Sequence, residues 1–240
     1  VIGSYLQNEV FREKVQGIAF RSAVVPEQAQ GIVNFVSGCI NDLAEEGISI
    51  IGAQGGYIEL PDISPRAYLQ ITENKKLPYW LYGIDNIENI PSKAEMEEGL
   101  KRYIETQFSE RCSFDFYRDT GYVISNDNID VNINIDNKDV KIILTSELNV
   151  NIKGEYFNLK DYIFVSIPSR LSEFYEMANE IIDRERQNSP LEFNTINLIS
   201  LWSKDDESGI PKISGMNFDC DNARYNLEDV GNVLLKGISQ

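Results

Sequence analysis

Residues 129–145, IDVNINIDNKDVKIILT, decide how this sequence folds. Apolar residues alternate with Asp and Asn from Ile129 to Ile135, and a second apolar run follows the polar turn at 136–138. Side chains on a β-strand point alternately to the two faces of the sheet. Alternation on both sides of a polar turn is typical of antiparallel strands with one buried face and one wet face. This stretch therefore predicts an antiparallel β-meander.

Further strands and one helix are predicted downstream of this turn. Apolar residues alternate again at Leu148, Val150 and Ile152, and residues 162–167 form another strand-like run. Residues 169–187 carry apolar side chains at helical spacing, which predicts an amphipathic helix covering the meander. The apolar positions of this helix are Leu171, Phe174, Tyr175, Ala178, Ile181 and Ile182.

Two more helices are predicted upstream of the meander. Residues 26–46 begin with a proline suited to a first helical turn, and Gly47 follows at the C-terminal capping position. Residues 93–111 follow Ser92, and Glu95 three positions later completes the pattern of a capping box. The apolar faces are Ile32, Val36, Cys39, Ile40 and Leu43 in the first helix, and Met96, Leu100, Tyr103, Ile104, Phe108 and Cys112 in the second.

The glycines of GAQGGYIELP, residues 52–61, raise the question of a phosphate-binding loop. Such a loop joins a strand to the N-terminus of a helix, whose amides bind the anion. Here the predicted order is a helix, a short apolar run, the glycines and then a strand at YIELP, and no Lys-Ser/Thr pair follows. We therefore interpret Gly52, Gly55 and Gly56 as a turn or bulge.

Residues 67–83 predict a β-hairpin with its turn at 74–76. This segment contains Tyr79, Trp80 and Tyr82, and aromatic side chains on a sheet can anchor a protein partner. The alternative is that they fill the core, because alternation lets at most half of them face outward.

These elements predict an α+β fold in which amphipathic helices and a β-hairpin precede an antiparallel β-meander covered by a helix. Residues 1–22 read as an irregular helix, whose apolar start fits a removed membrane anchor or an arbitrary chain boundary. Residues 23–115 form a helix-hairpin-helix region. Residues 116–240 hold the sheet, its covering helix and a C-terminal helix from Asn226. The last two segments are either separate domains or one continuous domain.

Composition excludes several classes of function. The 240 residues include 22 basic and 38 acidic residues, for a net charge of -16. Such a surface repels nucleic acids and anionic membranes. The sequence contains no histidine, which excludes Ser-His-Asp and Cys-His catalysis and His-ligated zinc. Carboxylate-only catalysis, lysine-assisted chemistry or no catalysis remain.

The Asp- and Asn-rich series around the meander offers oxygen ligands of the kind that calcium prefers. The candidate ligands are Asp127, Asp130 and Asp136. The run lacks the central glycine and terminal glutamate of an EF-hand loop. A solvated strand face explains these residues better, so we predict no metal and no cofactor.

Several motifs are spread along most of the chain. They are AEEGISIIGAQGGYI at 44–58, LPYW at 77–80, the capped helix ending at Cys112, SELNVNIKG at 146–154 and FDC at 218–220. In these motifs the sequence resembles uncharacterised archaeal surface proteins with an N-terminal membrane anchor, found in small-genome archaea. The resemblance implies an exported domain attached to a membrane helix.

We therefore expect an extracytoplasmic, non-enzymatic cell-surface module for assembly or binding. Its partners would be another protein or further copies of itself, and it would meet the membrane only through an N-terminal anchor. The alternative is a secreted carboxylate-dependent hydrolase acting on glycans, since two acidic residues suffice for that chemistry. With 38 acidic residues, the sequence singles out no catalytic pair.

The cysteines give a structural prediction. Cys39 and Cys112 lie on the apolar faces of their helices, so helices packing by those faces would bring both sulfurs into one interior. A disulfide persists in an exported protein. We predict a Cys39–Cys112 disulfide, which leaves Cys220 free or paired between chains. The alternative is three buried reduced cysteines.

Overall fold

The computed structural model describes residues 25–63, 67–72, 75–82, 87–125, 128–189, 193–195 and 197. The chain divides into two compact units, of which the first ends at Glu176 and the second begins at Met177. Four predictions fall outside the described residues: the helix over 1–22, Asp127, Cys220 and the helix from Asn226.

The predicted meander strands belong to two antiparallel sheets of three strands each. Strands β6 (Val131–Ile135) and β7 (Asp139–Leu144) pair around the polar turn, and β10 (Phe164–Pro168) joins β7 on its other side. The strand order of this sheet is β10-β7-β6. The second sheet has the order β5-β8-β9 and consists of β5 (Tyr122–Ile124), β8 (Asn149–Ile152) and β9 (Glu155–Asn158).

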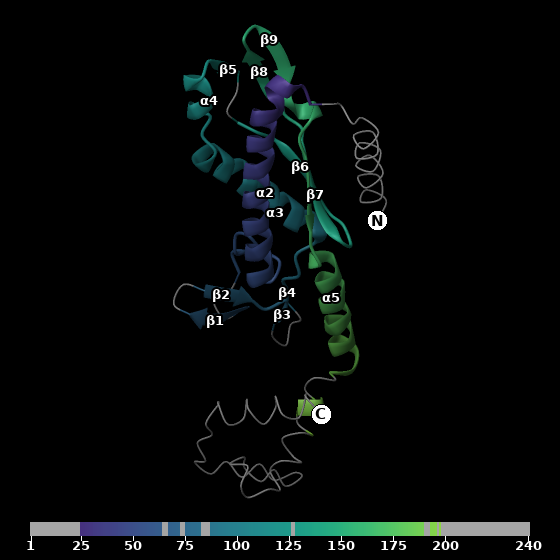
Figure 1. Ribbon diagram of the computed structural model, residues 1–240. Coiled ribbons are helices and arrows are strands. Elements are labelled where there is room, and N and C mark those ends of the chain that lie inside the picture. Colours follow the sequence, from purple (N-terminus) through teal and green to yellow (C-terminus); the bar gives the residue numbers. More distant parts are fainter. Residues whose placement is uncertain are drawn as a thin grey trace, which may run out of the picture. The chain divides into compact units, whose positions relative to one another are not determined.

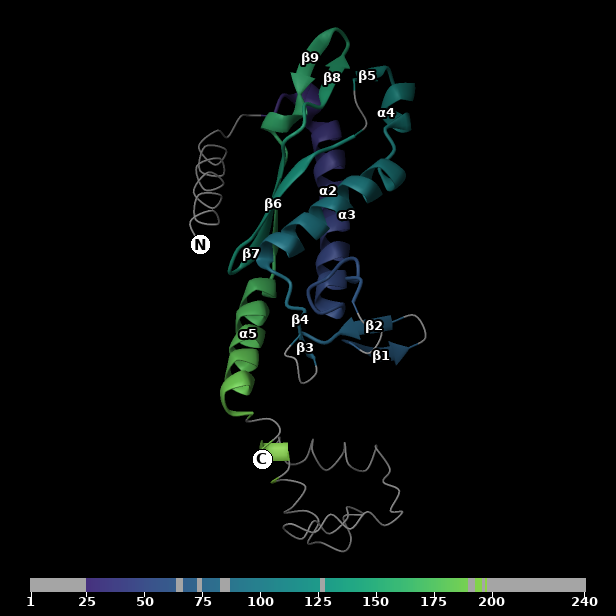
Figure 2. The same cartoon turned by 180° about the vertical axis from the view of Figure 1, so that it is seen from behind.

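Two long helices cover the first sheet (Figure 1). Helix α2 (Gln30–Ala53) packs against β10, helix α3 (Lys93–Arg111) packs against β6, and the helices also pack against each other. In Figure 2, which views the chain from behind, α3 crosses in front of α2. The α+β fold is confirmed, with two helices rather than the predicted helix over 169–187 as the cover. The sheet contributes to the core through Val131, Ile133, Ile135, Val140, Ile142, Leu144, Val165 and Ile167, which are all buried.

Helix α3 begins as the capping box predicts. The Ser92 side chain accepts a hydrogen bond from the Glu95 amide, and the Glu95 carboxylate accepts one from the Ser92 amide. These bonds satisfy two amides that the first helical turn leaves without partners. Met96, Leu100, Ile104 and Phe108 are buried on the predicted apolar face.

Helix α2 is longer than predicted, because Gly47 is not its cap. The helix runs through the apolar segment ISIIG and ends at Ala53. Gly47 is buried inside the helix, and a Cβ added there would overlap the Leu100 side chain of α3. The glycine is therefore a point of close approach between two helices. The turn follows later, at Gly55 and Gly56, whose φ angles are +64° and +97°.

The segment between the two helices contains two short hairpins. Strands β1 (Tyr68–Thr72) and β2 (Lys75–Pro78) confirm the predicted hairpin, although Lys75 and Lys76 belong to β2 and not to the turn. The predicted strand at 57–61 is wrong, since these residues form no strand. The second hairpin consists of β3 (Leu81–Tyr82) and β4 (Ile87–Glu88).

Helix α5 (Leu171–Asn188) confirms the predicted third helix. Its first turn buries Ser172, whereas Phe174 is 55% exposed. The described chain also contains the short helices η1 (Glu27–Ala29), α4 (Asp115–Asp119) and η3 (Leu159–Asp161).

Candidate functional site

The structure contains the predicted disulfide between Cys39 of α2 and Cys112, the residue that ends α3. The two Cα atoms lie 6.3 Å apart, within the range that a disulfide spans. The pairing follows from the helix faces, since each cysteine continues the buried row of its own helix. The bond therefore fastens the N-terminal half of α2 to the C-terminal end of α3.

The three aromatic residues predicted to bind a partner divide into two groups. The rings of Tyr79 and Tyr82 stack with centroids 6.0 Å apart and an interplanar angle of 13°. Tyr79 is 38% exposed and faces outward, whereas Tyr82 beneath it is partly buried. Trp80 turns inward: its indole N–H donates to the Gly55 carbonyl oxygen at 2.7 Å, and its ring meets the edge of Tyr175. Tyr79 and Tyr82 remain candidate binding residues, whereas Trp80 has a structural partner.

The turn at Gly55 and Gly56 leaves room for the Trp80 indole to pack against the backbone. At Gly55 a Cβ would lie 3.1 Å from Leu77 and 3.5 Å from the Trp80 indole nitrogen, and at Gly56 a Cβ would overlap Pro91. Both glycines also have positive φ, which other residues rarely adopt. The turn therefore positions the aromatic segment.

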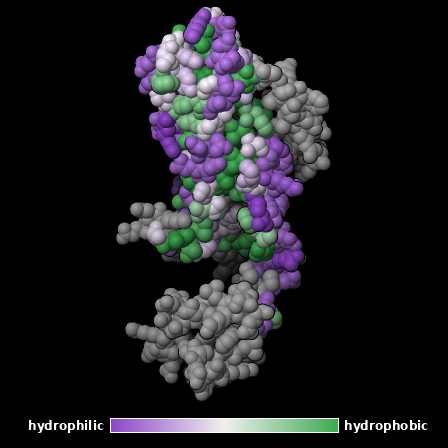
Figure 3. Space-filling model, viewed as in Figure 1, coloured by the Kyte–Doolittle hydropathy of each residue, from purple (hydrophilic) through white to green (hydrophobic). Residues whose placement is uncertain are grey.

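Exposed apolar side chains extend from the tyrosine pair along the first hairpin. The Tyr79 amide donates to the Ala67 carbonyl at 2.9 Å, which continues the β1–β2 ladder and places Tyr79 on the same face as Leu69. Leu69 is 46% exposed and Ile71 is 49% exposed. We call Leu69, Ile71, Tyr79 and Tyr82 the hairpin patch. In Figure 3 hydrophobic surface gathers over this hairpin.

Sequence reasoning missed the aliphatic half of this patch. Leu69 and Ile71 are two residues apart in YLQIT, so regular alternation would place them on one face of the strand, although the β1–β2 register shifts between Gln70 and Thr72. That signal predicts a shared face, but it does not tell whether the face is covered. The exposure of the patch becomes visible only in the folded chain.

The two described calcium candidates are occupied by other groups. Asp130 accepts from the Lys101 Nζ at 2.7 Å and from the Thr145 hydroxyl at 2.7 Å. Asp136 accepts from the Lys141 Nζ at 2.7 Å and from the Asn137 amide at 2.8 Å. Among the residues that the structure describes, no group of three or more acidic or cysteine side chains is arranged to hold a metal ion.

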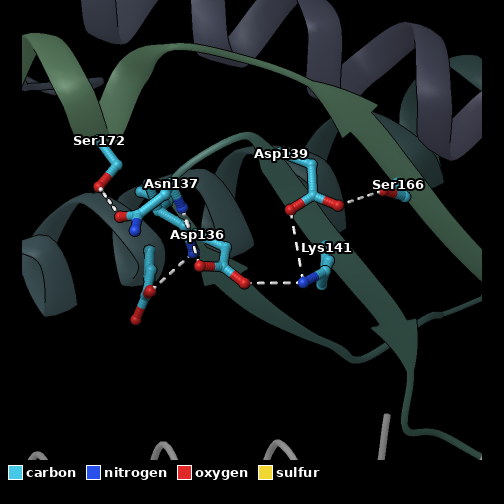
Figure 4. Close-up of polar contacts among 8 residues, drawn as sticks. Asp136, Asn137, Asp139, Lys141, Ser166 and Ser172 are labelled. Carbon is cyan, nitrogen blue, oxygen red and sulfur yellow. Dashed lines mark hydrogen bonds and ion pairs between the residues drawn. The ribbon is translucent and has the colours of Figure 1, made fainter. Parts of the chain in front are cut away.

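Asp136 belongs to a polar network at the β6–β7 turn (Figure 4). Lys141 contacts both Asp136 and Asp139, and Asp139 accepts from the Ser166 hydroxyl at 2.8 Å. These contacts tie the turn to the outer face of β10. Lys141 offsets part of the negative charge of the two aspartates.

A serine and a lysine lie together at the start of α5, a combination that some hydrolases use. Lys93 Nζ donates to the Ser172 hydroxyl at 2.9 Å and forms an ion pair with Glu176 at 2.6 Å. Ser172 is completely buried and contacts Asn137 as well. A hydroxyl without access to solvent cannot reach a substrate, so this group joins the first turn of α5 to α3 and to the β6–β7 turn.

One carboxylate pair shows the opposed pKa shifts expected of an acid and a base. Burial raises the pKa of Glu105, and its net shift is upward although it accepts a hydrogen bond from the Val131 amide. Burial also acts on Asp130, but hydrogen bonds from Lys101 and Thr145 outweigh it and lower the pKa. Both carboxylates are held by partners within the fold, as in a structural cluster.

A small cavity lies elsewhere, with a volume of about 130 Å³. Ligand pockets usually measure roughly 300–1,000 Å³, so this cavity suits a few water molecules better than a glycan. It contains no acidic side chain, because its lining consists of Gln28, Thr120, Gly121, Tyr122, Ile152 and Lys153.

Comparison with protein-family models, curated proteins and solved structures finds no match to this chain. In the described part of the chain, no helix has the length and apolar character needed to cross a membrane. The hairpin patch and the disulfide are the features of the described chain that bear most on function.

Proposed function

We propose that this chain is an extracytoplasmic, non-enzymatic cell-surface module that assembles with further copies of itself through the hairpin patch. The observation that carries the proposal is exposed Tyr79, stacked on the partly buried Tyr82, beside exposed Leu69 and Ile71. Contiguous exposed apolar surface is characteristic of interaction sites, and aromatic anchors contribute much of the binding energy at interfaces.

The support beneath the patch favours binding over accidental exposure. Trp80 is fixed by its hydrogen bond to Gly55, and the Tyr57 hydroxyl donates to the Asn89 carbonyl at 2.9 Å. The Asn89 amide in turn donates to the Trp80 carbonyl at 2.8 Å. These bonds hold the tyrosine pair in place before any partner arrives, which lowers the entropic cost of association.

The proposed location draws on the disulfide. A structural disulfide is compatible with an oxidising compartment outside the cytoplasm. Attachment to the membrane through an N-terminal anchor, as in the archaeal surface proteins that the sequence resembles, is part of the same proposal. The high negative charge suits a soluble surface domain, because like charges limit nonspecific contact and leave the apolar patch as the specific one.

Sedimentation velocity over about a hundredfold range of concentration tests this proposal, since self-association follows mass action. We expect the mass of the wild-type protein to rise with concentration. The variant Leu69→Ser/Tyr79→Ser should remain at the monomer mass. The control Tyr156→Ser removes an equally large aromatic, 79% exposed on β9, and should behave as wild type. The proposal would be contradicted by a wild-type protein that stays monomeric at every concentration. It would also be contradicted if the Leu69→Ser/Tyr79→Ser variant and the Tyr156→Ser control associated to the same extent.

A further inference from the structure

Strand β6 lies at an edge of its sheet, and its outward amides can be identified from the ladder. The Asp136 amide donates to the Asp139 carbonyl at 2.9 Å, so hydrogen-bonded pairs fall on even-numbered residues of β6. The amides of Val131, Ile133 and Ile135 therefore point away from β7. An edge of this kind is a template for pairing with another strand.

Two glutamates of α3 occupy this edge. Glu105 Oε1 accepts a hydrogen bond from the Val131 amide at 3.0 Å, and Glu97 Oε1 accepts one from the Ile135 amide at 2.9 Å. Lys101 lies between them on the same side of the helix and reaches Asp130 at 2.7 Å. A row of three charged side chains thus follows the edge of the strand.

The spacing of the two glutamates matches the spacing of the two amides. Eight residues of an α-helix rise about 12 Å, whereas four residues of a β-strand extend about 13 Å. Positions 97 and 105 of the helix can therefore meet positions 131 and 135 of the strand without distortion of either element. Helix α3 supplies acceptors at positions where a neighbouring strand would supply carbonyl groups.

The sequence of β6 explains why its edge needs a cover. The strand VNINI has no charged residue, no proline and no glycine, and it alternates aliphatic residues with asparagine. Short uncharged segments of this kind form cross-β contacts readily, and asparagine ladders add to their stability. Inward-pointing charges are a known means of closing such an edge.

We propose that Glu97 and Glu105 close the β6 edge against strand pairing with a second copy of this chain. The carboxylates take up the amides that such a pairing needs. This function is separate from the hairpin patch. The β6 edge is the surface that assembly must avoid, and the hairpin patch is the surface that it uses.

Three double variants test this inference in the full chain. Glu97→Ala/Glu105→Ala removes both acceptors, whereas Glu97→Gln/Glu105→Gln keeps an acceptor oxygen at each position. Glu98→Ala/Glu110→Ala makes the same change of net charge at exposed positions of α3. Each variant is compared with wild type at the same concentration by native mass spectrometry and by hydrogen exchange of individual amides. If the wild-type protein is monomeric, the proposed function fails, but the comparison of each variant with wild type still tests the β6 edge.

We expect Glu97→Ala/Glu105→Ala to form species larger than wild type and to exchange the Val131 and Ile135 amides about tenfold faster or more, as the loss of a charge-assisted hydrogen bond implies. The Gln variant and the exposed control should keep the wild-type mass. An alanine variant of wild-type mass would overturn the inference, whether or not its amides exchange faster. So would association of the Gln variant to the same extent. If the double variant does not fold, Glu105→Ala alone must show the same mass shift, with faster exchange confined to Val131.

Discussion

Gly47 shows at the scale of one residue how α2 and α3 fit together. The glycine is buried in the middle of α2, and a Cβ there would overlap Leu100 and approach Tyr103 at 3.2 Å. Leu100 is completely buried and has little freedom to move aside. The close approach of the helices therefore depends on the missing side chain, at the cost of the low helix propensity of glycine.

Two glycine substitutions in the same helix should have opposite effects. Gly38 is exposed and a Cβ there meets nothing within 4 Å, so Gly38→Ala should raise the free energy of unfolding by about 0.5–1 kcal/mol. Gly47→Ala should lower it by about 1 kcal/mol, because overpacking outweighs the gain in propensity. Urea denaturation measures both. A stabilised Gly47→Ala protein would contradict the packing described for this position.

The disulfide should make a large contribution to stability. Cys39 and Cys112 are 73 residues apart in sequence, and closing a loop of that length stabilises a fold by about 4 kcal/mol in the chain-entropy model. We expect Cys39→Ser/Cys112→Ser to lose about this much free energy of unfolding in urea. Reduced wild-type protein is the control and should lose a similar amount. Unchanged stability in both would show that the bond does not constrain the chain.

Helix α3 contributes to the fold in three ways. Its buried row packs on α2 and the sheet, its N-terminus carries the capping box, and its row of Glu97, Lys101 and Glu105 follows the β6 edge. Glu97 is half-buried, so its pKa differs between the folded and the unfolded chain. The stability of the fold therefore depends on pH through this residue. Burial raises the pKa of Glu97, although the Ile135 amide and Lys93 lower it in part.

The raised pKa of Glu97 predicts the sign of a pH effect. The folded chain keeps this proton to a higher pH than the unfolded chain, whose value lies near 4.5. The stabilisation is therefore fully present below pH 4.5 and is lost as pH rises through the folded pKa. Glutamine does not titrate, so the Glu97→Gln protein does not suffer this loss. Its free energy of unfolding, relative to that of wild type, should therefore increase as pH rises above 4.5. Urea curves for the two proteins from about pH 4, near the ordinary pKa of a glutamate, up to about pH 8 test this. Parallel pH profiles would contradict it.

Local elements with strong sequence signals were predictable, whereas contacts between elements, apart from the Cys39–Cys112 disulfide, were not. The alternation around 129–145 and the capping box at Ser92 and Glu95 depend on neighbouring residues, and both are present in the structure. Gly47 was ambiguous, because a glycine suits both a helix end and a close helix contact. Leu100, which decides between these, is 53 positions away in the sequence.

The candidate site was predictable only in part for the same reason. The tyrosines of PYWLY stood out by composition, but the inward turn of Trp80 depends on its hydrogen bond to Gly55. Glu97 and Glu105 resemble ordinary solvated acids on a helix. Their role depends on the order of strands in the sheet, which places β6 at the edge beside α3.

At the scale of the whole molecule, we expect assembly and no catalysis. The acidic pair Glu105 and Asp130 is tied to Lys101, Thr145 and the Val131 amide, so neither group is free to serve a substrate. A panel of glycans incubated with the protein should therefore show no hydrolysis. Hydrolysis that a single Glu105→Gln or Asp130→Asn substitution abolishes would restore the alternative of a secreted glycan hydrolase.

We propose that this chain works outside the cytoplasm as a disulfide-bridged module. Non-reducing peptide mapping of the native protein, with free thiols alkylated in intact cells before lysis, tests the bridge and the location together. We predict that the Cys39 and Cys112 peptides are recovered linked to each other and take up label only after reduction, as expected in an oxidising compartment. Recovery of both peptides unlinked and alkylated before reduction would contradict the disulfide in the native protein and the proposed location with it.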